Sequence, residues 1–192
     1  MIVPTREEAW KLLNEYTHTE SLLHHALAVE AAMRYYAAKF EGDVEQWGVA
    51  GLIHDFDYEQ HPTPEEHPGT GVRILTELGW PKEIVDAVAG HGWNFGVPRE
   101  TLMAKSLFAV DELTGFVAAC ALVRPSKSIL DLTASSVRKK WKDKAFARNV
   151  SREDMERGAQ EIGVSLEEHI ANVIAAMVPV ADELGLAGQL QA

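Results

Sequence analysis

The sequence has very little cysteine and no long apolar segment. Cys120 is the only cysteine among the 192 residues, so the chain can form no internal disulfide and no cysteine-based zinc site. No apolar run approaches the length that crosses a membrane, and the first residues lack the apolar region of a signal peptide. We therefore expect a cytoplasmic protein.

Basic residues are also in the minority. The chain has 18 Lys and Arg against 29 Asp and Glu, and its formal net charge of −11 argues against general nucleic-acid binding. The exception is the segment 124–148, where eight basic residues and two aspartates give a net charge of +6. Basic residues at helical spacing are typical of a solvated face. RNA binding is the alternative, although Trp141 is the only aromatic partner that we note for it.

No segment alternates cleanly between polar and apolar residues, whereas spacings of three and four recur along the chain. We expect an all-α protein that forms a single domain over 1–192, without internal repeats. Capping residues, prolines and glycines predict helices over 5–14, 21–40, 43–55, 63–79, 81–92 and 99–123, followed by two that begin at Ser151 and Ser165, the last ending near Gly185.

Two of these predicted helices have particular features. In 63–79, Thr63 is the expected N-cap and Glu66 the expected capping glutamate, so His67 would lie in the first helical turn. In 99–123, Gly115 lies in mid-helix, where glycine costs about 1 kcal/mol relative to alanine. We expect close helix packing or a kink to offset that cost.

Polar residues lie at unusual positions in the predicted helices, either on an apolar face or at a helix end. A single histidine of this kind is most often a hydrogen-bonded core residue, and a single aspartate is often a cap. Buried carboxylates, however, cost several kcal/mol unless they are paired or bound to a metal. Two carboxylates and four imidazoles on five predicted helices therefore predict a divalent metal site built from His25, His54, Asp55, His67, His91 and Asp111.

The order of four of these residues resembles a known family. His25, the adjacent pair His54-Asp55 and then Asp111 are similar to the motif of the HD-domain superfamily of metal-dependent phosphohydrolases, over about residues 20–115. The resemblance implies an HD-domain helical bundle, with additional C-terminal helices here in 124–185. It also implies that these four residues bind a metal ion.

Two further elements resemble HD proteins that bind two ions. The segment from His67 to Gly71 is similar to the His-Pro-x-x-Gly element of HDIG and HD-GYP proteins, and His91 is similar to their later histidine. The resemblance implies that Asp55 bridges two ions. Tyr58 replaces the lysine of HD-GYP proteins, Asp57 replaces a glycine, and Gly92 follows His91 where a second histidine is usual, which argues against cyclic-dinucleotide cleavage. The chain is most similar to small stand-alone HDIG-type proteins.

Imidazole and carboxylate ligands without sulfur suit one or two ions of Mn, Fe, Ni or Zn, and suit Mg less well. We expect hydrolysis of a small phosphate ester or nucleotide by metal-activated water. Asp57 is either a catalytic general base or a loop cap or partner of a ligating histidine. Arg124 and Lys127 are candidate contacts for the substrate, and Trp93 either stacks on it or packs in the core.

Two other functions remain open from the sequence. A diiron oxygenase related to inositol oxygenase would use a similar set of four histidines and two aspartates. A non-catalytic metal-binding module would keep the ligands without the reaction. Apart from a small phosphorylated substrate, we expect no membrane or nucleic-acid partner, and a homodimer remains open.

Overall fold

The computed structural model describes residues 4–92 and 96–188, and the regular structure of these residues is entirely helical. The all-α prediction is confirmed. The helices are α1 (Arg6–Tyr16), α2 (Glu20–Lys39), α3 (Val44–Ile53), α4 (Gly69–Glu77), α5 (Lys82–His91), α6 (Leu102–Leu122), α7 (Ala134–Trp141), α8 (Arg152–Glu161) and α9 (Leu166–Met177), with a short 3₁₀ helix at Val178–Val180. No helix within the described ranges has both the length and the apolar character needed to cross a membrane.

Most helices begin at the expected capping residues. Thr5 accepts a hydrogen bond from the Glu8 backbone, and the Glu8 carboxylate accepts one from the Thr5 backbone at 2.7 Å, which completes a capping box. The side chains of Asp43, Ser151 and Ser165 accept hydrogen bonds from the first turns of α3, α8 and α9. These local signals therefore set where the chain enters each helix.

The predicted helix start at Thr63 is wrong. The Thr63 hydroxyl donates a hydrogen bond to the Glu66 carboxylate at 2.9 Å, and the His67 amide donates one to the Thr63 carbonyl. These two hydrogen bonds close only a turn. Proline lacks an N–H group and disfavours the helical conformation of the residue before it, so a helix does not continue from His67 into Pro68. α4 begins at Gly69, and His67 lies in the preceding turn.

The predicted end of the last helix near Gly185 is also wrong. α9 ends at Met177, and the chain continues through the short 3₁₀ helix and turns. Pro179 lies in that 3₁₀ helix and has no N–H to donate to an α-helical carbonyl. The segment after it turns back toward α6 and lines a cavity with that helix.

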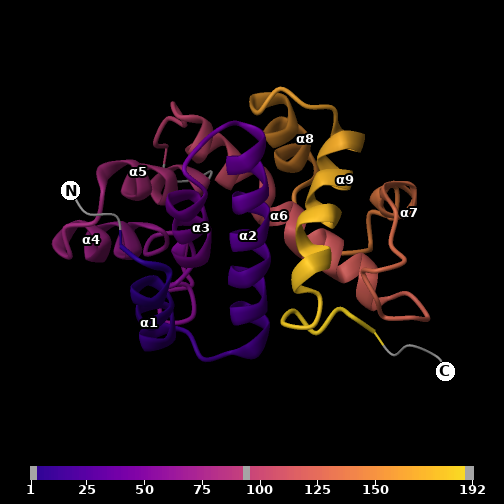
Figure 1. Ribbon diagram of the computed structural model, residues 1–192, viewed down its shortest axis with the longest axis horizontal. Coiled ribbons are helices and arrows are strands. Elements are labelled where there is room, and N and C mark those ends of the chain that lie inside the picture. The colour runs from indigo at the N-terminus through magenta and orange to yellow at the C-terminus, as the bar shows by residue number, and fades with distance from the viewer. Residues whose placement is uncertain (1–3, 93–95, 189–192) are drawn as a thin grey trace.

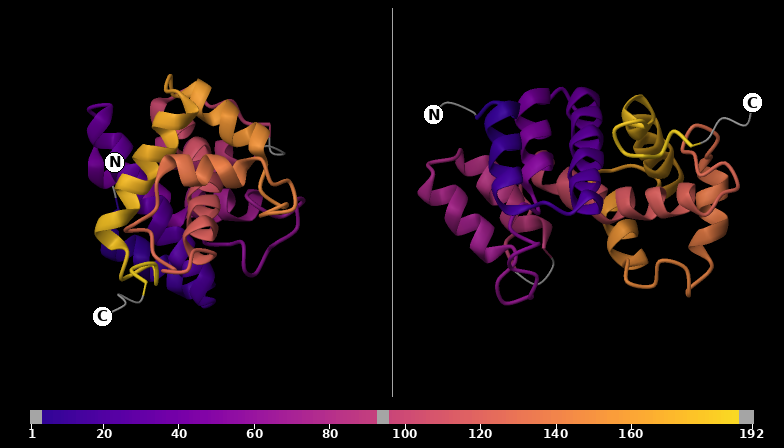
Figure 2. Two further views of the ribbon diagram at one scale, coloured as in Figure 1. Left: turned by 90° about the vertical axis from the view of Figure 1, so that its right-hand side faces the viewer. Right: turned by 90° about the horizontal axis from the view of Figure 1, so that it is seen from below.

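Helix α2 stands in the middle of the molecule (Figure 1). α1, α3, α4 and α5 lie on one side of it, and α7, α8 and α9 lie on the other. α6 passes behind α2 and extends into both groups, as the view from below also shows (Figure 2). α2 packs on α3, α6 and α9, so the core is continuous through these helices.

A buried polar chain joins three helices on the C-terminal side of α2. His169 on α9 is fully buried, with Nε2 2.8 Å from the carbonyl of Ala109 on α6. A carbonyl only accepts, so Nε2 carries the proton, and Nδ1 accepts a 2.6 Å bond from the Tyr36 hydroxyl on α2. Burial lowers the pKa of His169 to about 4. The ring is therefore neutral and fixed in one tautomer.

Candidate metal centre

The end of α3 supplies the residues at the centre of the site. His54 follows the last residue of α3, and its side chain is fully buried. Its Nδ1 lies 2.8 Å from the Gly51 carbonyl, so Nδ1 carries the proton and Nε2 has a free lone pair. Nε2 is buried and makes no hydrogen bond. An unsatisfied buried nitrogen of this kind is what an imidazole ligand presents to a metal ion.

Three acidic or imidazole groups surround that nitrogen. One oxygen each of Asp55 and Asp111 lies 3.4 Å from His54 Nε2. His25, on α2, places its Nε2 3.0 Å from Asp111 Oδ1 and 3.8 Å from Asp55 Oδ2. One ligand atom from each of these four residues lies within 4.8 Å of the others. This set is compact enough for a single ion to contact all four.

The other oxygen of Asp55 faces a second group. His67 Nε2 and His91 Nε2 each lie 3.1 Å from Asp55 Oδ1, and they lie 3.2 Å from one another. Asp55 is thus shared by two clusters, one oxygen to each. The carboxylate can therefore bridge two ions.

The histidine tautomers explain why these clusters need a positive charge. Nδ1 of His91 donates to the Val88 carbonyl, and Nδ1 of His67 donates to a carboxylate oxygen of Asp57. With His54, three imidazoles thus use Nδ1 as a donor, and in their neutral form they direct Nε2 lone pairs at carboxylate oxygens. Lone pairs facing lone pairs at these distances repel each other unless a proton or a metal ion lies between them.

The pKa directions show the same demand for positive charge. Burial alone would lower the pKa of His54, but the adjacent charges of Asp55 and Asp111 raise it well above its usual value. Burial also opposes the charged form of His67, but the carboxylates of Asp55 and Asp57 favour it. The pKa of His67 therefore rises to about 9. Burial raises the pKa of Asp55, and the histidines around it lower that pKa well below its usual value. The carboxylates stay ionised, and the cluster favours positive charge, which protons on the histidines or a divalent ion can supply.

Asp57 lies behind this cluster. Its side chain is fully buried, with Oδ1 accepting from His67 Nδ1 at 2.9 Å and Oδ2 accepting from the Gly71 amide at 2.8 Å. A β-carbon at Gly71 would lie 2.9 Å from the Asp57 carboxylate carbon, so only glycine allows this approach. The contacts are those of a residue that orients His67.

Residues 22–114 match the HD domain family. All six clustered residues lie within this matched segment, which supports membership of the HD-domain superfamily. No curated protein and no solved structure matches the chain at a significant level.

The fold brings together every ligand residue that the sequence predicts: His25, His54, Asp55, His67, His91 and Asp111. Arg124 and Lys127 are not among them. Both residues come after the end of α6. At a rise of 1.5 Å per residue, that helix end is about 16 Å from Asp111. Arg124 is paired with Asp131 at 2.8 Å. The third candidate substrate contact, Trp93, lies outside the described residues.

The sequence analysis did not predict an open space next to this cluster of histidines and aspartates. His24, Gly115 and Met177 line a cavity that also reaches His25. Part of it was detectable in the sequence, because Thr114 and Gly115 follow Asp111 by three and four residues and so lie on the same helix face. The contribution of Met177 depends on the tertiary fold.

Proposed function

We propose that the protein is a metal-dependent phosphohydrolase that acts on a small phosphate ester. The observation that carries the proposal is a set of three imidazoles, His54, His67 and His91. Each directs Nδ1 at an acceptor outside the cluster, which leaves Nε2 facing carboxylate oxygens 3.1 to 3.4 Å away. Such an arrangement is stable when cations lie between the groups. The HD domain match supports the same reading.

The residues fit two adjacent ions. His25, His54, Asp55 and Asp111 would hold the first, and Asp55, His67 and His91 would hold the second. The second position has only three protein ligands, which leaves room for a substrate oxygen or water. The donor set contains no sulfur, which favours Mn, Fe, Ni or Zn over softer ions.

Ions in these positions supply Lewis acidity toward a phosphoryl oxygen and a lowered pKa for bound water. The chain's own residues supply geometry. The carbonyls of Gly51 and Val88 fix the tautomers of His54 and His91, and Asp57 does the same for His67. We assign Asp57 to positioning rather than to a general-base role, because both its oxygens already accept hydrogen bonds.

We further propose that the chain is of the HDIG type and acts in the cytoplasm. The segment His67-Pro68-Gly69-Thr70-Gly71 supports the subtype by its contacts. Gly71 provides the amide that holds Asp57, and Asp57 in turn holds His67.

A metal-stripped and reloaded protein tests the proposed function. Chelation should abolish phosphate release from a panel of phosphomonoesters and nucleotides, and Mn²⁺, Ni²⁺, Zn²⁺ or Fe²⁺ should restore it. His54→Ala should reduce the activity by at least 100-fold, whereas His18→Ala, at an exposed histidine, should leave it unchanged. Full activity in His54→Ala would overturn the proposal. Dioxygen uptake by the iron-loaded protein without phosphate release would instead favour the oxygenase.

A further inference from the structure

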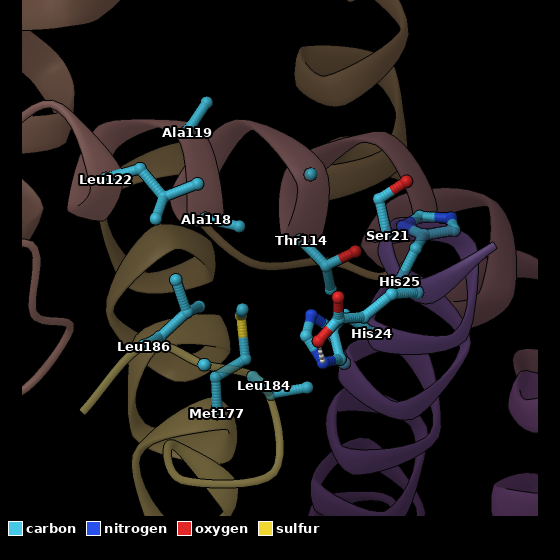
Figure 3. Close-up of a pocket in the computed structure, with 14 residues that line it drawn as sticks. Ser21, His24, His25, Thr114, Ala118, Ala119, Leu122, Met177, Leu184 and Leu186 are labelled. Atoms are coloured by element: carbon cyan, nitrogen blue, oxygen red, sulfur yellow. Dashed lines mark ion pairs between the residues drawn. The ribbon is translucent and has the colours of Figure 1, made fainter. Parts of the chain in front are cut away.

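A cavity of about 580 Å³ opens beside His25, between α2, α6 and the C-terminal segment (Figure 3). Its volume is that of an ordinary small-molecule site. Ser21, His24 and His25 face it from one end, and Leu122 and Leu186 lie at the other. His25 belongs both to this cavity and to the proposed metal cluster, so the cavity adjoins the cluster at His25.

The helices that carry two of the metal ligands also form walls of the cavity. On α2, Ala28 lies three residues after His25, on the same face. On α6, Gly115 and Ala118 follow Asp111 by four and seven residues, again on one face. A phosphoryl group at the metal cluster would therefore have this space beside it for the rest of the substrate.

The third wall comes from residues beyond the HD domain match. Met177, at the end of α9, and Leu184 and Leu186, in the turn that follows, close the cavity opposite α2 and α6. Figure 3 shows these three side chains grouped across from Thr114. The C-terminal segment thus adds an apolar surface to a site whose ligands all come from residues 22–114.

The lining has little charge for a substrate to pair with. Among the described residues that line the cavity, Glu20 is the one with a formal charge at neutral pH, and no lysine or arginine is present. The phosphates of a nucleoside di- or triphosphate would meet a carboxylate here and no cation. Most of the other lining residues are alanine, leucine, methionine or glycine, which favours an uncharged, apolar group.

Gly115 keeps part of this space open. A β-carbon at this position would meet no atom within 4 Å, so of the two expected explanations, close packing or a kink, close packing is ruled out. Glycine in mid-helix is unfavourable relative to alanine, and here no neighbouring atom requires it. The missing side chain instead enlarges the cavity next to Thr114 and His25.

We propose that the cavity binds the leaving group of the substrate, and that this substrate is a phosphate monoester of an uncharged, mainly apolar alcohol. The hydrolytic part rests on the function proposed above. In that reaction the bond between phosphorus and the alcohol oxygen breaks, water supplies a new oxygen to phosphorus, and a proton from water goes to the released alcohol. Binding of the apolar group itself depends only on the cavity.

A homologous series of n-alkyl phosphates tests this assignment. Calorimetry with the Mn²⁺-loaded protein would measure the binding of methyl, butyl and octyl phosphate and of adenosine monophosphate, alongside phosphate release from each. Each buried methylene should tighten binding roughly three- to fourfold, which is on the order of 100-fold from butyl to octyl. Adenosine monophosphate should bind more weakly than octyl phosphate.

Variants at Gly115 provide the matched test. Gly115→Leu places its β-carbon in open space and extends the side chain into the cavity, so it should fold normally, as a thermal melt would verify. It should weaken octyl phosphate binding at least tenfold and flatten the dependence on chain length. Gly115→Ala adds only one carbon and should have an intermediate effect.

The outcomes separate the two proposals. Binding that does not depend on chain length, or that Gly115→Leu leaves unchanged, would overturn the cavity assignment even if short esters are hydrolysed. Equal or tighter binding of adenosine monophosphate would also overturn it. Chain-length-dependent binding that is lost in Gly115→Leu, without phosphate release from any ester, would support the cavity assignment and overturn the hydrolase.

Discussion

Asp57 links two parts of the site, because its carboxylate accepts from the His67 imidazole at 2.9 Å and from the Gly71 amide at 2.8 Å. The Nδ1–H of His67 and the backbone N–H of Gly71 each donate to one of its two oxygens. The proposed second ion position would therefore depend on a residue that is not one of its ligands.

Asp57→Asn should weaken metal binding at one position only. The asparagine amide offers one acceptor oxygen and one donor group, so one of the two donors would face another donor. We expect a 10- to 100-fold loss of affinity at the position of His67 and His91, with the other position unchanged. Calorimetric titration of the stripped protein would resolve the two steps. Asp86→Asn, at a half-exposed aspartate paired with Lys82, is the control, and equal losses in both variants would contradict the role of Asp57.

Two mid-helix glycines should respond in opposite directions to alanine. At Gly158 on α8, a β-carbon would lie 2.6 Å from the Ala109 backbone of α6, so Gly158→Ala should destabilise the fold by about 1–3 kcal/mol. At Gly115 the space is open, and Gly115→Ala should stabilise it by up to about 1 kcal/mol. Denaturant unfolding of both variants measures the difference. If Gly115→Ala were less stable than Gly158→Ala, the packing around α6 would differ from that in the structure.

The neutral state of His169 should make stability depend on pH. Its pKa is about 4 in the fold and about 6.5 in an unfolded chain, so the unfolded chain binds the proton more readily. The contribution of His169 is complete above pH 6.5, declines as the pH falls toward 4, and is then lost. Its full size is about 3 kcal/mol.

His169→Gln isolates this contribution from that of the other histidines. Glutamine cannot titrate, but its amide can still donate to Ala109 and accept from Tyr36. Free energies of unfolding measured from pH 4 to 7 should fall more steeply with acid in the wild type than in the variant. Parallel profiles would show that His169 is not the buried neutral group described here.

The residues of the proposed metal cluster were predictable because the face of a helix on which a residue lies follows from its spacing to nearby residues. His25 shares a helix face with Leu22 and Val29, three residues before it and four after it, and its Nε2 lies 3.0 Å from Asp111. Capping residues such as Thr5 likewise act within one turn. The start of α4 was mispredicted because the capping pattern at Thr63 and the proline at 68 favour different structures.

Long-range packing was not predictable. Glu30 is only 4% exposed although the sequence gives no sign of it, because Arg6 from α1 pairs with it at 2.7 Å. The cavity beside His25 similarly needs Met177 and Leu186, which are distant in sequence. Neither feature follows from the spacing of residues within one helix.

Ion stoichiometry tests the central claim most directly, namely that cations hold the clustered imidazoles and carboxylates together. Stripped protein reloaded with Mn²⁺ or Fe²⁺ and analysed by elemental mass spectrometry should contain two ions per chain. His25→Ala and His91→Ala should each retain one ion, and Asp55→Ala, which removes the shared carboxylate, should retain neither at full occupancy. A folded wild-type protein that binds no ion under these conditions would contradict the account.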